Sequence, residues 1–151
     1  MSDPSIPRIK LVNFQEYQTG IMDVRTAVLV EELAITPHLE WDGRDSHARY
    51  AIATVNEKVV GTGRMHPDGE IGIAILPDWR RQGIGSQILE CLVEAAVHAG
   101  QNSVYLSSQL DAVNFYARHG FLMTAETCLA AGIPHQHMHL DLIAKAAHAH
   151  I

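Results

Sequence analysis

The stretch from Ile71 to Ser86 constrains the fold of this chain more than any other part of its sequence. An apolar segment typical of a buried strand leads into a short cationic turn, and the pattern of a long helix follows. A helix start exposes unpaired backbone N–H groups and the positive end of the helix dipole. Glycines let a bulky anion approach those amides, and arginines add fixed positive charge. The sequence therefore predicts a phosphate-binding turn built from Arg80, Arg81, Gly83 and Gly85.

Composition describes an ordinary globular protein. The 151 residues, 47% of them apolar, are enough for one domain over 1–151 with its own core. No apolar run is long enough to span a bilayer, and the N-terminus lacks a signal-peptide pattern, so we expect a cytoplasmic protein with no membrane partner. Cys91 and Cys128 are far apart, and Cys91 falls in a helical apolar pattern, which favours a buried thiol over a disulfide. The net charge of −6 argues against nucleic-acid binding but leaves room for an anionic cofactor at the cationic turn.

Periodicity and turn signals divide the chain into alternating strands and helices. We expect strands at 8–12, 50–55, 59–65, 70–76, 104–106, 121–125 and 137–142. We expect helices at 15–33, divided or kinked at Gly20, at 84–99 and at 111–119. A hairpin turn at 56–58, a loop around 131–134 and a flexible tail at 144–151 complete the prediction. The order β-α-α-β-β-β-α-β-α-β-β indicates an α/β fold, a mixed sheet with helices on both faces.

The helix after the turn has the clearest pattern. Its predicted buried stripe is Ile84, Ile88, Cys91, Leu92, Ala95 and Ala99, with Gln87, Glu90, Glu94 and His98 opposite. Gly100 is expected to end it. The next strand, reached through this crossover helix, should run parallel to the strand before the turn.

Two motifs in this framework resemble the GNAT superfamily of acyl-CoA-dependent N-acyltransferases. Residues 80–85, Arg-Arg-Gln-Gly-Ile-Gly, fit the signature R/Q-x-x-G-x-G/A, and residues 115–121, Phe-Tyr-Ala-Arg-His-Gly-Phe, fit the later F-Y-x-x-x-G-F. Segments 25–32, 39–43 and 131–138 are similar to the ElaA-like branch, so the resemblance extends from residue 8 to about 142. Departures occur at Leu33, where that branch has Gln, and at Tyr50, where His is expected.

The resemblance implies a GNAT-like fold, with a largely antiparallel sheet and a central parallel pair of strands that splay apart. Acetyl-CoA would be the co-substrate, with its pyrophosphate on the amides of the turn and its pantetheine arm between the splayed strands. Gln109 stands where many relatives place a pantetheine-contacting Asn. The implied cofactor-binding residues are Ile73, Ala74, Ile75, Arg80, Arg81, Gln82, Gly83, Ile84, Gly85, Ser86 and Gln109.

The resemblance also implies transfer of the acetyl group to a primary amine by direct attack in a ternary complex. Backbone N–H near Ile75 would polarise the thioester carbonyl, and Tyr116 would be the acid that serves the leaving thiolate. Glu32 is the preferred base, with Glu70 and Asp42 as alternatives. Trp41, Asp42 and His135 are the predicted substrate-binding residues. The family also suggests a homodimer.

Other interpretations remain open at this stage. Tyr116 is also consistent with a core aromatic, Glu32 with a solvated helix residue, and Trp41 with a packed lid. His135, His137 and His139 alternate along a strand, which favours a surface histidine ladder over a metal site, and no metal is predicted. The departures at Leu33 and Tyr50 motivate an alternative function, a non-catalytic domain that binds or senses acyl-CoA. A third possibility is a site for another phosphorylated ligand.

Overall fold

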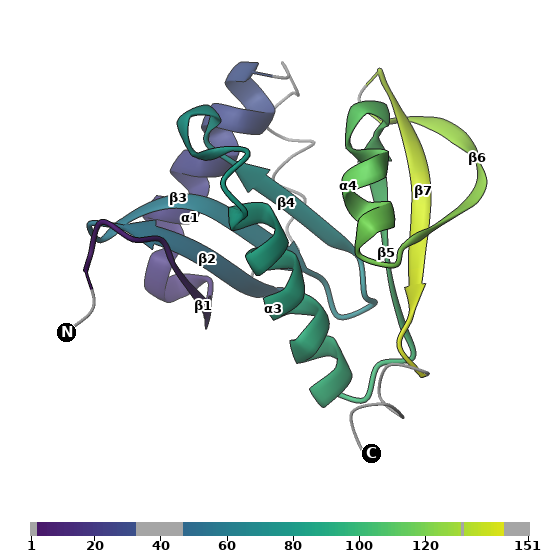
Figure 1. Ribbon diagram of the computed structural model, residues 1–151, viewed down its shortest axis with the longest axis horizontal. Helices are drawn as coiled ribbons and strands as arrows, with labels where there is room; N and C mark the ends of the chain where they lie inside the picture. Colours follow the sequence, from purple (N-terminus) through teal and green to yellow (C-terminus); the bar gives the residue numbers. More distant parts are fainter. Residues whose placement is uncertain (1–2, 33–46, 131, 144–151) are drawn as a thin grey trace.

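The computed structural model describes residues 3–32, 47–130 and 132–143, with the side chains of residues 30–32, 125, 126 and 130 not described (Figure 1). It is a mixed α/β structure, as predicted. The strands are β1 (Arg8–Val12), β2 (Arg49–Val55), β3 (Lys58–Met65), β4 (Ile71–Ile75), β5 (Ser103–Gln109), β6 (Leu122–Ala130) and β7 (Ile133–Asp141). The α-helices are α1 (Gln18–Arg25), α3 (Ile84–His98) and α4 (Val113–Arg118), with a π-helix at Thr26–Glu32 and short 3-10 turns at Gln15–Tyr17, Pro77–Trp79 and Leu110–Ala112.

The strands form two sheets that separate at the centre of the molecule. Sheet A has the order β1-β2-β3-β4 and sheet B the order β5-β7-β6, with every neighbouring pair antiparallel. β4 and β5 meet at one end, where Glu70 and Tyr105 form a parallel bridge and the Tyr105 amide donates to the Gly69 carbonyl at 3.0 Å. From there the two strands diverge (Figure 1). The predicted splayed parallel pair is confirmed, and it opens the centre of the fold.

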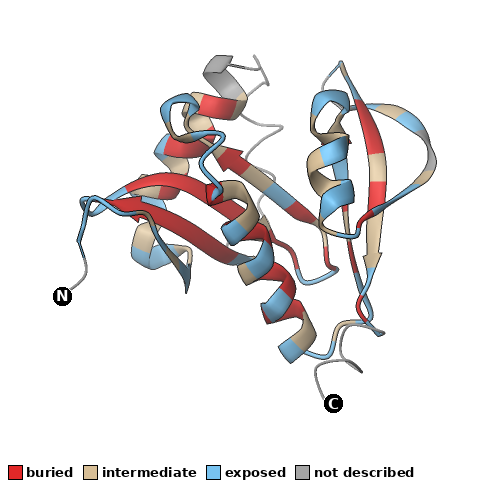
Figure 2. Ribbon diagram, viewed as in Figure 1, coloured by how far each residue is buried: buried red, intermediate tan, exposed pale blue. Residues whose placement is uncertain are grey.

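Helix α3 packs on one face of sheet A, and α1 lies on the other (Figure 1). The close approach of α3 depends on Gly63 of β3, where an added Cβ would lie 2.4 Å from Cγ2 of Ile88. Buried and exposed positions alternate along α3 (Figure 2). Its buried face is wider than predicted: Leu89, Val93 and Ala96 are buried, whereas Cys91 is partly exposed and Ala99, which follows the helix, is exposed. The predicted stripe was too narrow because α3 contacts strands of both sheets.

The prediction of a division at Gly20 was wrong, because Gly20 lies inside α1. A Cβ at this position would lie 2.6 Å from Cγ2 of Val59 on β3, so glycine lets the helix approach the sheet. The irregularity comes later, at Thr26, where the α-helix passes into the π-helix. Buried Ile21 and Val24 fix this segment against Tyr50 in the second core cluster.

The predicted hairpin is present between β2 and β3. Asn56 and Glu57 have φ values of 50° and 67°, the left-handed conformation that tight hairpin turns require. Lys58 belongs to β3 rather than to the turn.

The second hairpin, between β6 and β7, is tighter than predicted. Ile133 and Pro134, expected in a loop, belong to β7 and lie opposite Ala130 and Leu129. β7 is the central strand of sheet B, but β5 pairs with it only from His135 onward, so Pro134 near its start has a strand neighbour on one side only, where proline is tolerated. The expected tail at 144–151 lies outside the described residues.

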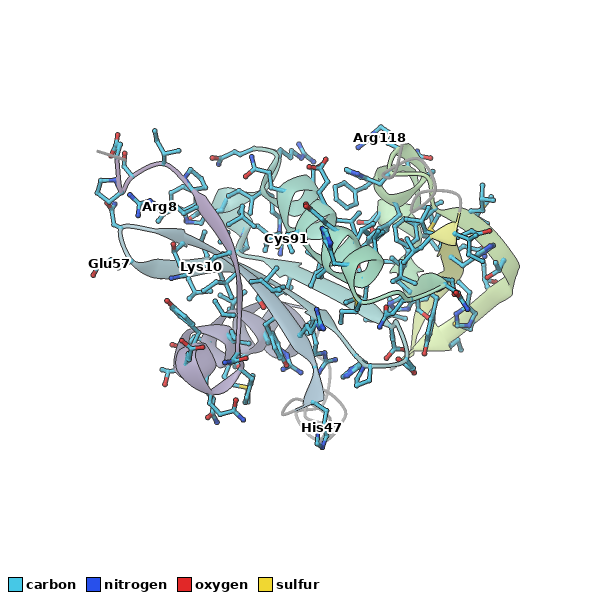
Figure 3. The ribbon with its side chains drawn as sticks, turned by 90° about the horizontal axis from the view of Figure 1, so that it is seen from below. Arg8, Lys10, His47, Glu57, Cys91 and Arg118 are labelled. Atoms are coloured by element: carbon cyan, nitrogen blue, oxygen red, sulfur yellow. The ribbon has the colours of Figure 1, made fainter. Side chains whose placement is uncertain are left out.

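The remaining expectations concern cysteines and membranes. Cys91 and Cys128 are both free and partly exposed, so the absence of a disulfide is confirmed and full burial of Cys91 is not. Figure 3 shows Cys91 on α3, with Arg8 and Lys10 of β1 toward one end of the molecule and Arg118 of α4 toward the other. No helix within the described residues is long and apolar enough to cross a membrane.

Candidate active site

The gap between the splayed strands is a cleft of about 700 Å³. It collects most of the predicted cofactor-binding residues from three elements. β4 contributes Ile73, Ala74 and Ile75. The cationic loop and the start of α3 contribute Arg80, Arg81, Gly83, Gly85 and Ser86. β5 contributes Gln109, together with Ser107 and Ser108, which were not in the predicted set.

The turn before α3 has the geometry expected of an anion site. Gly83, the residue that precedes the helix, has φ of 82°, and Arg81 has φ of 62°, a conformation that L side chains rarely adopt. The Arg80 side chain folds back toward the end of β4, where its Nε donates a hydrogen bond to the Ile75 carbonyl at 2.9 Å. No side chain of the described residues caps the start of α3. The first amides of the helix are therefore left for a ligand, next to two arginines.

Two residues of the predicted set do not line the cleft. Gln82 turns back on the preceding 3-10 turn, where its Nε2 donates to the Asp78 carbonyl at 3.1 Å. Ile84 is 2% exposed and belongs to the core below α3. Any contribution of these two residues to cofactor binding therefore comes from their backbone, and cofactor binding stays a prediction for the whole set.

Helix α4 covers the turn and carries Tyr116 into the cleft. Phe115 packs so close to Gly85 that a Cβ there would lie 3.4 Å from Cζ of the ring. Tyr116 packs edge-on against Phe115 and Phe121, with centroid distances of 5.0 and 5.8 Å. Burial raises the pKa of the Tyr116 phenol to about 12. Its hydroxyl has no hydrogen-bond partner within the described part of the chain, so the phenol lies at the cleft protonated and able to donate.

A second contact ties α4 to the anion site. Oγ of Ser86, in the first turn of α3, lies 3.0 Å from Nε2 of His119 at the end of α4. The helix that carries Tyr116 is thereby anchored to the helix whose amides form the anion site.

Of the three alternating histidines, His135 lines the cleft. Its Nδ1 lies 2.7 Å from the Ile133 carbonyl, which can only accept, so Nδ1 carries a proton and neutral His135 keeps its lone pair on Nε2. His137 contacts Ser107 Oγ through Nδ1 at 2.9 Å. No group of three or more His, Cys, Asp or Glu side chains suited to a metal is found among the described residues.

The candidate bases and substrate residues are less completely placed. Glu32 ends the π-helix, with its side chain outside the description, and Trp41 and Asp42 lie outside the described residues altogether. Glu70 is described and does not line the cleft. Its carboxylate lies 3.9 Å from Nε2 of His66, where β4 and β5 meet.

Several cleft residues were not anticipated from the sequence. Arg25, at the end of α1, is 3% exposed and donates from Nη1 to the Tyr50 hydroxyl at 3.1 Å. Thr62 and Arg64 line the cleft from β3, and Arg118 from α4. They carry no local motif, because strand register and helix packing bring them to the cleft from distant parts of the sequence.

A cleft between splayed strands, with an anion-binding helix start and a tyrosine beside it, is the arrangement of an acyl-CoA-dependent acyltransferase. Comparison with known proteins agrees. Residues 28–142 match the acetyltransferase (GNAT) domain family, and the chain belongs to this family of acyltransferases.

The similarity to individual relatives extends over most of the chain. It is 33% identical over 123 residues to the uncharacterized N-acetyltransferase YjcF of Bacillus subtilis, covering 78% of this chain and 88% of that protein. The solved structure of an acyl-CoA N-acyltransferase from Pseudomonas aeruginosa matches with a TM-score of 0.79 and 26% identity, over 89% of this chain and 99% of that one. Escherichia coli ElaA shares the fold, with a TM-score of 0.80 and 23% identity over 89% and 99% of the two chains.

Proposed function

We propose that this protein transfers the acetyl group of acetyl-CoA to a primary amine by direct attack in a ternary complex. The observation that carries the proposal is that a single cleft is lined by the uncapped start of α3, by Gln109 and by Tyr116. A GNAT acetyltransferase from Elizabethkingia anophelis, solved with acetyl-CoA bound, shares the fold with a TM-score of 0.65. In this chain the pyrophosphate would bind the turn amides beside Arg80 and Arg81, and pantetheine would lie along β4.

The attacking amine must be neutral, so one proton leaves it before or during bond formation. We retain Glu32 as the proposed base, and Nε2 of His135 as a hydrogen-bond acceptor that orients the amine. As the new C–N bond forms, the C–S bond breaks and its electron pair leaves on sulfur. A backbone N–H near Ile75 would hold the carbonyl oxygen as charge develops.

Tyr116 would stabilise the leaving thiolate. A thiol has a pKa of about 8.5, well below the value of about 12 for this phenol. Complete proton transfer from Tyr116 to the thiolate is therefore uphill. We propose that Tyr116 donates a hydrogen bond to the sulfur, while the proton released by the amine ultimately neutralises it.

The acceptor is proposed to be a small molecule. The aminoalkylphosphonate N-acetyltransferase of Salmonella typhimurium, 36% identical over 90 residues, covering 51% of this chain and 58% of that protein, is named for a small amine substrate.

The test is thiol release from acetyl-CoA with a panel of small primary amines and a lysine peptide, with acetylated product identified by mass. Coenzyme A should also raise the melting temperature, whereas ATP should not. Binding of coenzyme A without thiol release from any amine would support a sensing domain instead. Equal stabilisation by ATP would indicate another phosphorylated ligand.

A further inference from the structure

One end of the cleft has a charge and polarity that coenzyme A binding at the α3 turn does not explain. Five arginines line the cleft, and among its described lining residues Asp111 is the one carboxylate. Arg80 and Arg81 belong to the turn and Arg118 to α4, beside the proposed pyrophosphate site. The other two, Arg25 and Arg64, come from α1 and β3.

Strand register brings these two arginines together. Arg64 lies directly opposite Tyr50 of β2 and opposite Gly72 of β4, so the three residues form a row on one face of sheet A. Arg25 reaches this row through its hydrogen bond to Tyr50. A Cβ added to Gly72 would have no atom of the described residues within 4 Å, which leaves open space beside Arg64.

Thr62 adds a neutral hydrogen-bonding group to the same face, because it lies two residues before Arg64 on β3. Its side chain lines the cleft and is 2% exposed, yet its hydroxyl has no hydrogen-bond partner among the described residues. Leaving a buried hydroxyl unpaired destabilises a fold. A methyl group of similar shape would avoid this cost, so the hydroxyl is better explained by a ligand than by packing.

We infer that the acceptor amine carries an acidic group, a carboxylate, phosphonate or phosphate, which binds Arg64, Arg25 and the Thr62 hydroxyl. A guanidinium has five donors, and the bond to Tyr50 uses one donor of Arg25. Arg25 and Arg64 also make other interactions within the protein. These residues lie on the face of sheet A that packs against α1 and the π-helix, where Ala74 and Val28 also line the cleft. Pantetheine would lie along β4, beside this region. The inference rests on the proposed function, since it names the substrate class of the same site.

The experiment compares β-alanine and 2-aminoethylphosphonate with uncharged amines of matched size, β-alaninamide and propylamine, in the thiol-release assay. The acidic amines should have kcat/KM at least about tenfold higher, the effect of one hydrogen bond to a charged group. Arg64→Met should lower kcat/KM for the acidic amines by a larger factor than for propylamine, and so remove most of this preference. Arg49→Met, an exposed arginine of β2 outside the cleft, is the matched control and should change neither.

Thr62→Val separates a binding role from a structural one. The variant should melt at a higher temperature than the wild type, because it removes an unpaired buried hydroxyl. It should nevertheless lose several-fold in kcat/KM for the acidic amines. A lower melting temperature together with unchanged kinetics would overturn this role for Thr62.

Different results would refute the acidic acceptor and the proposed acetyltransferase function. Equal or faster turnover of the uncharged amines refutes the acidic acceptor and leaves the acetyltransferase intact. If no amine is turned over, the acidic site is tested by binding instead. The melting temperature of the coenzyme A complex is measured with and without N-acetyl-β-alanine. A shift in the wild type that Arg64→Met abolishes would support the acidic site without the reaction, and no shift would refute it.

Discussion

Helix α3 offers a matched pair of substitutions that isolates cofactor binding from backbone strain. Gly83 precedes the helix with φ of 82°, and Gly100 follows it with φ of 75°. At both positions an added Cβ would have no atom of the described residues within 4 Å. Alanine at either end should therefore cost the same left-handed strain, about 1–2 kcal/mol, with no steric difference. For a chain of this length that corresponds to a fall in melting temperature of about 2–8 °C for each variant.

The two variants should differ in their response to coenzyme A. Gly83 lines the cleft and Gly100 does not, so only Gly83→Ala places a methyl group where the proposed pyrophosphate site lies. Loss of one charge-assisted hydrogen bond corresponds to about tenfold in Kd. At a ligand concentration of about 100 times the wild-type Kd, coenzyme A stabilises by about 2.7 kcal/mol, and a tenfold weaker variant by about 1.4 kcal/mol.

The assay is the melting temperature of wild type, Gly83→Ala and Gly100→Ala, each with and without coenzyme A. The ligand-induced shift should be roughly halved in Gly83→Ala and unchanged in Gly100→Ala. A full shift in Gly83→Ala would refute the assignment of the turn as the anion site. An equal reduction in both variants would indicate that strain in α3, rather than obstruction, weakens binding.

Other substitutions have distinct expected results. Gly85→Ala should raise the free energy of unfolding by about 0.5–1 kcal/mol in urea denaturation, because its Cβ would make an ordinary contact with Phe115; a fall in that free energy would contradict the contact. Tyr116→Phe should lower kcat by about 10²-fold with the KM for acetyl-CoA unchanged; an unaltered kcat would remove Tyr116 from the mechanism. Because the Tyr116 pKa is raised to about 12, its stabilising effect is complete below the unfolded value near 10 and falls as pH rises toward 12. Wild type should therefore lose up to about 3 kcal/mol more than Tyr116→Phe across that window in urea melts, and equal losses would contradict the raised pKa. Gly20→Ala should destabilise by about 1–3 kcal/mol, and the double variant with Val59→Ala should show favourable coupling; additive losses would mean that the close contact is not the cause.

The sequence led to the residues of the proposed cofactor site because these residues are local. The turn amides, Arg80, Arg81 and the start of α3 lie within a few residues of one another, and hydrophobic periodicity places them after a strand and before a helix. Tyr116 lies farther along the chain, and it was predicted from a second motif, residues 115–121. The hairpin at Asn56 was equally local, since its turn conformation depends on two adjacent residues.

The residues of the proposed acceptor site could not be predicted in the same way. Arg25, Thr62 and Arg64 have no spacing that signals a site, and each is individually consistent with an ordinary surface or strand residue. They meet because β2, β3 and β4 pair in one register and α1 packs across that row. The π-helix was also missed, because an extra residue per turn changes the apolar period little over the seven residues from Thr26 to Glu32.

The proposed cofactor site and the proposed acceptor site are built on different elements, and this has a physical consequence for binding of the two substrates. The proposed anion site lies at the start of α3, which packs closely on sheet A at Gly63. Arg25, by contrast, stands where α1 becomes a π-helix, a feature often found at functional sites. Arg25 and the turn before α3 thus belong to different elements of the fold. Substitutions in the π-helix should alter the choice of amine while leaving coenzyme A affinity constant, whereas substitutions at the α3 turn should do the reverse.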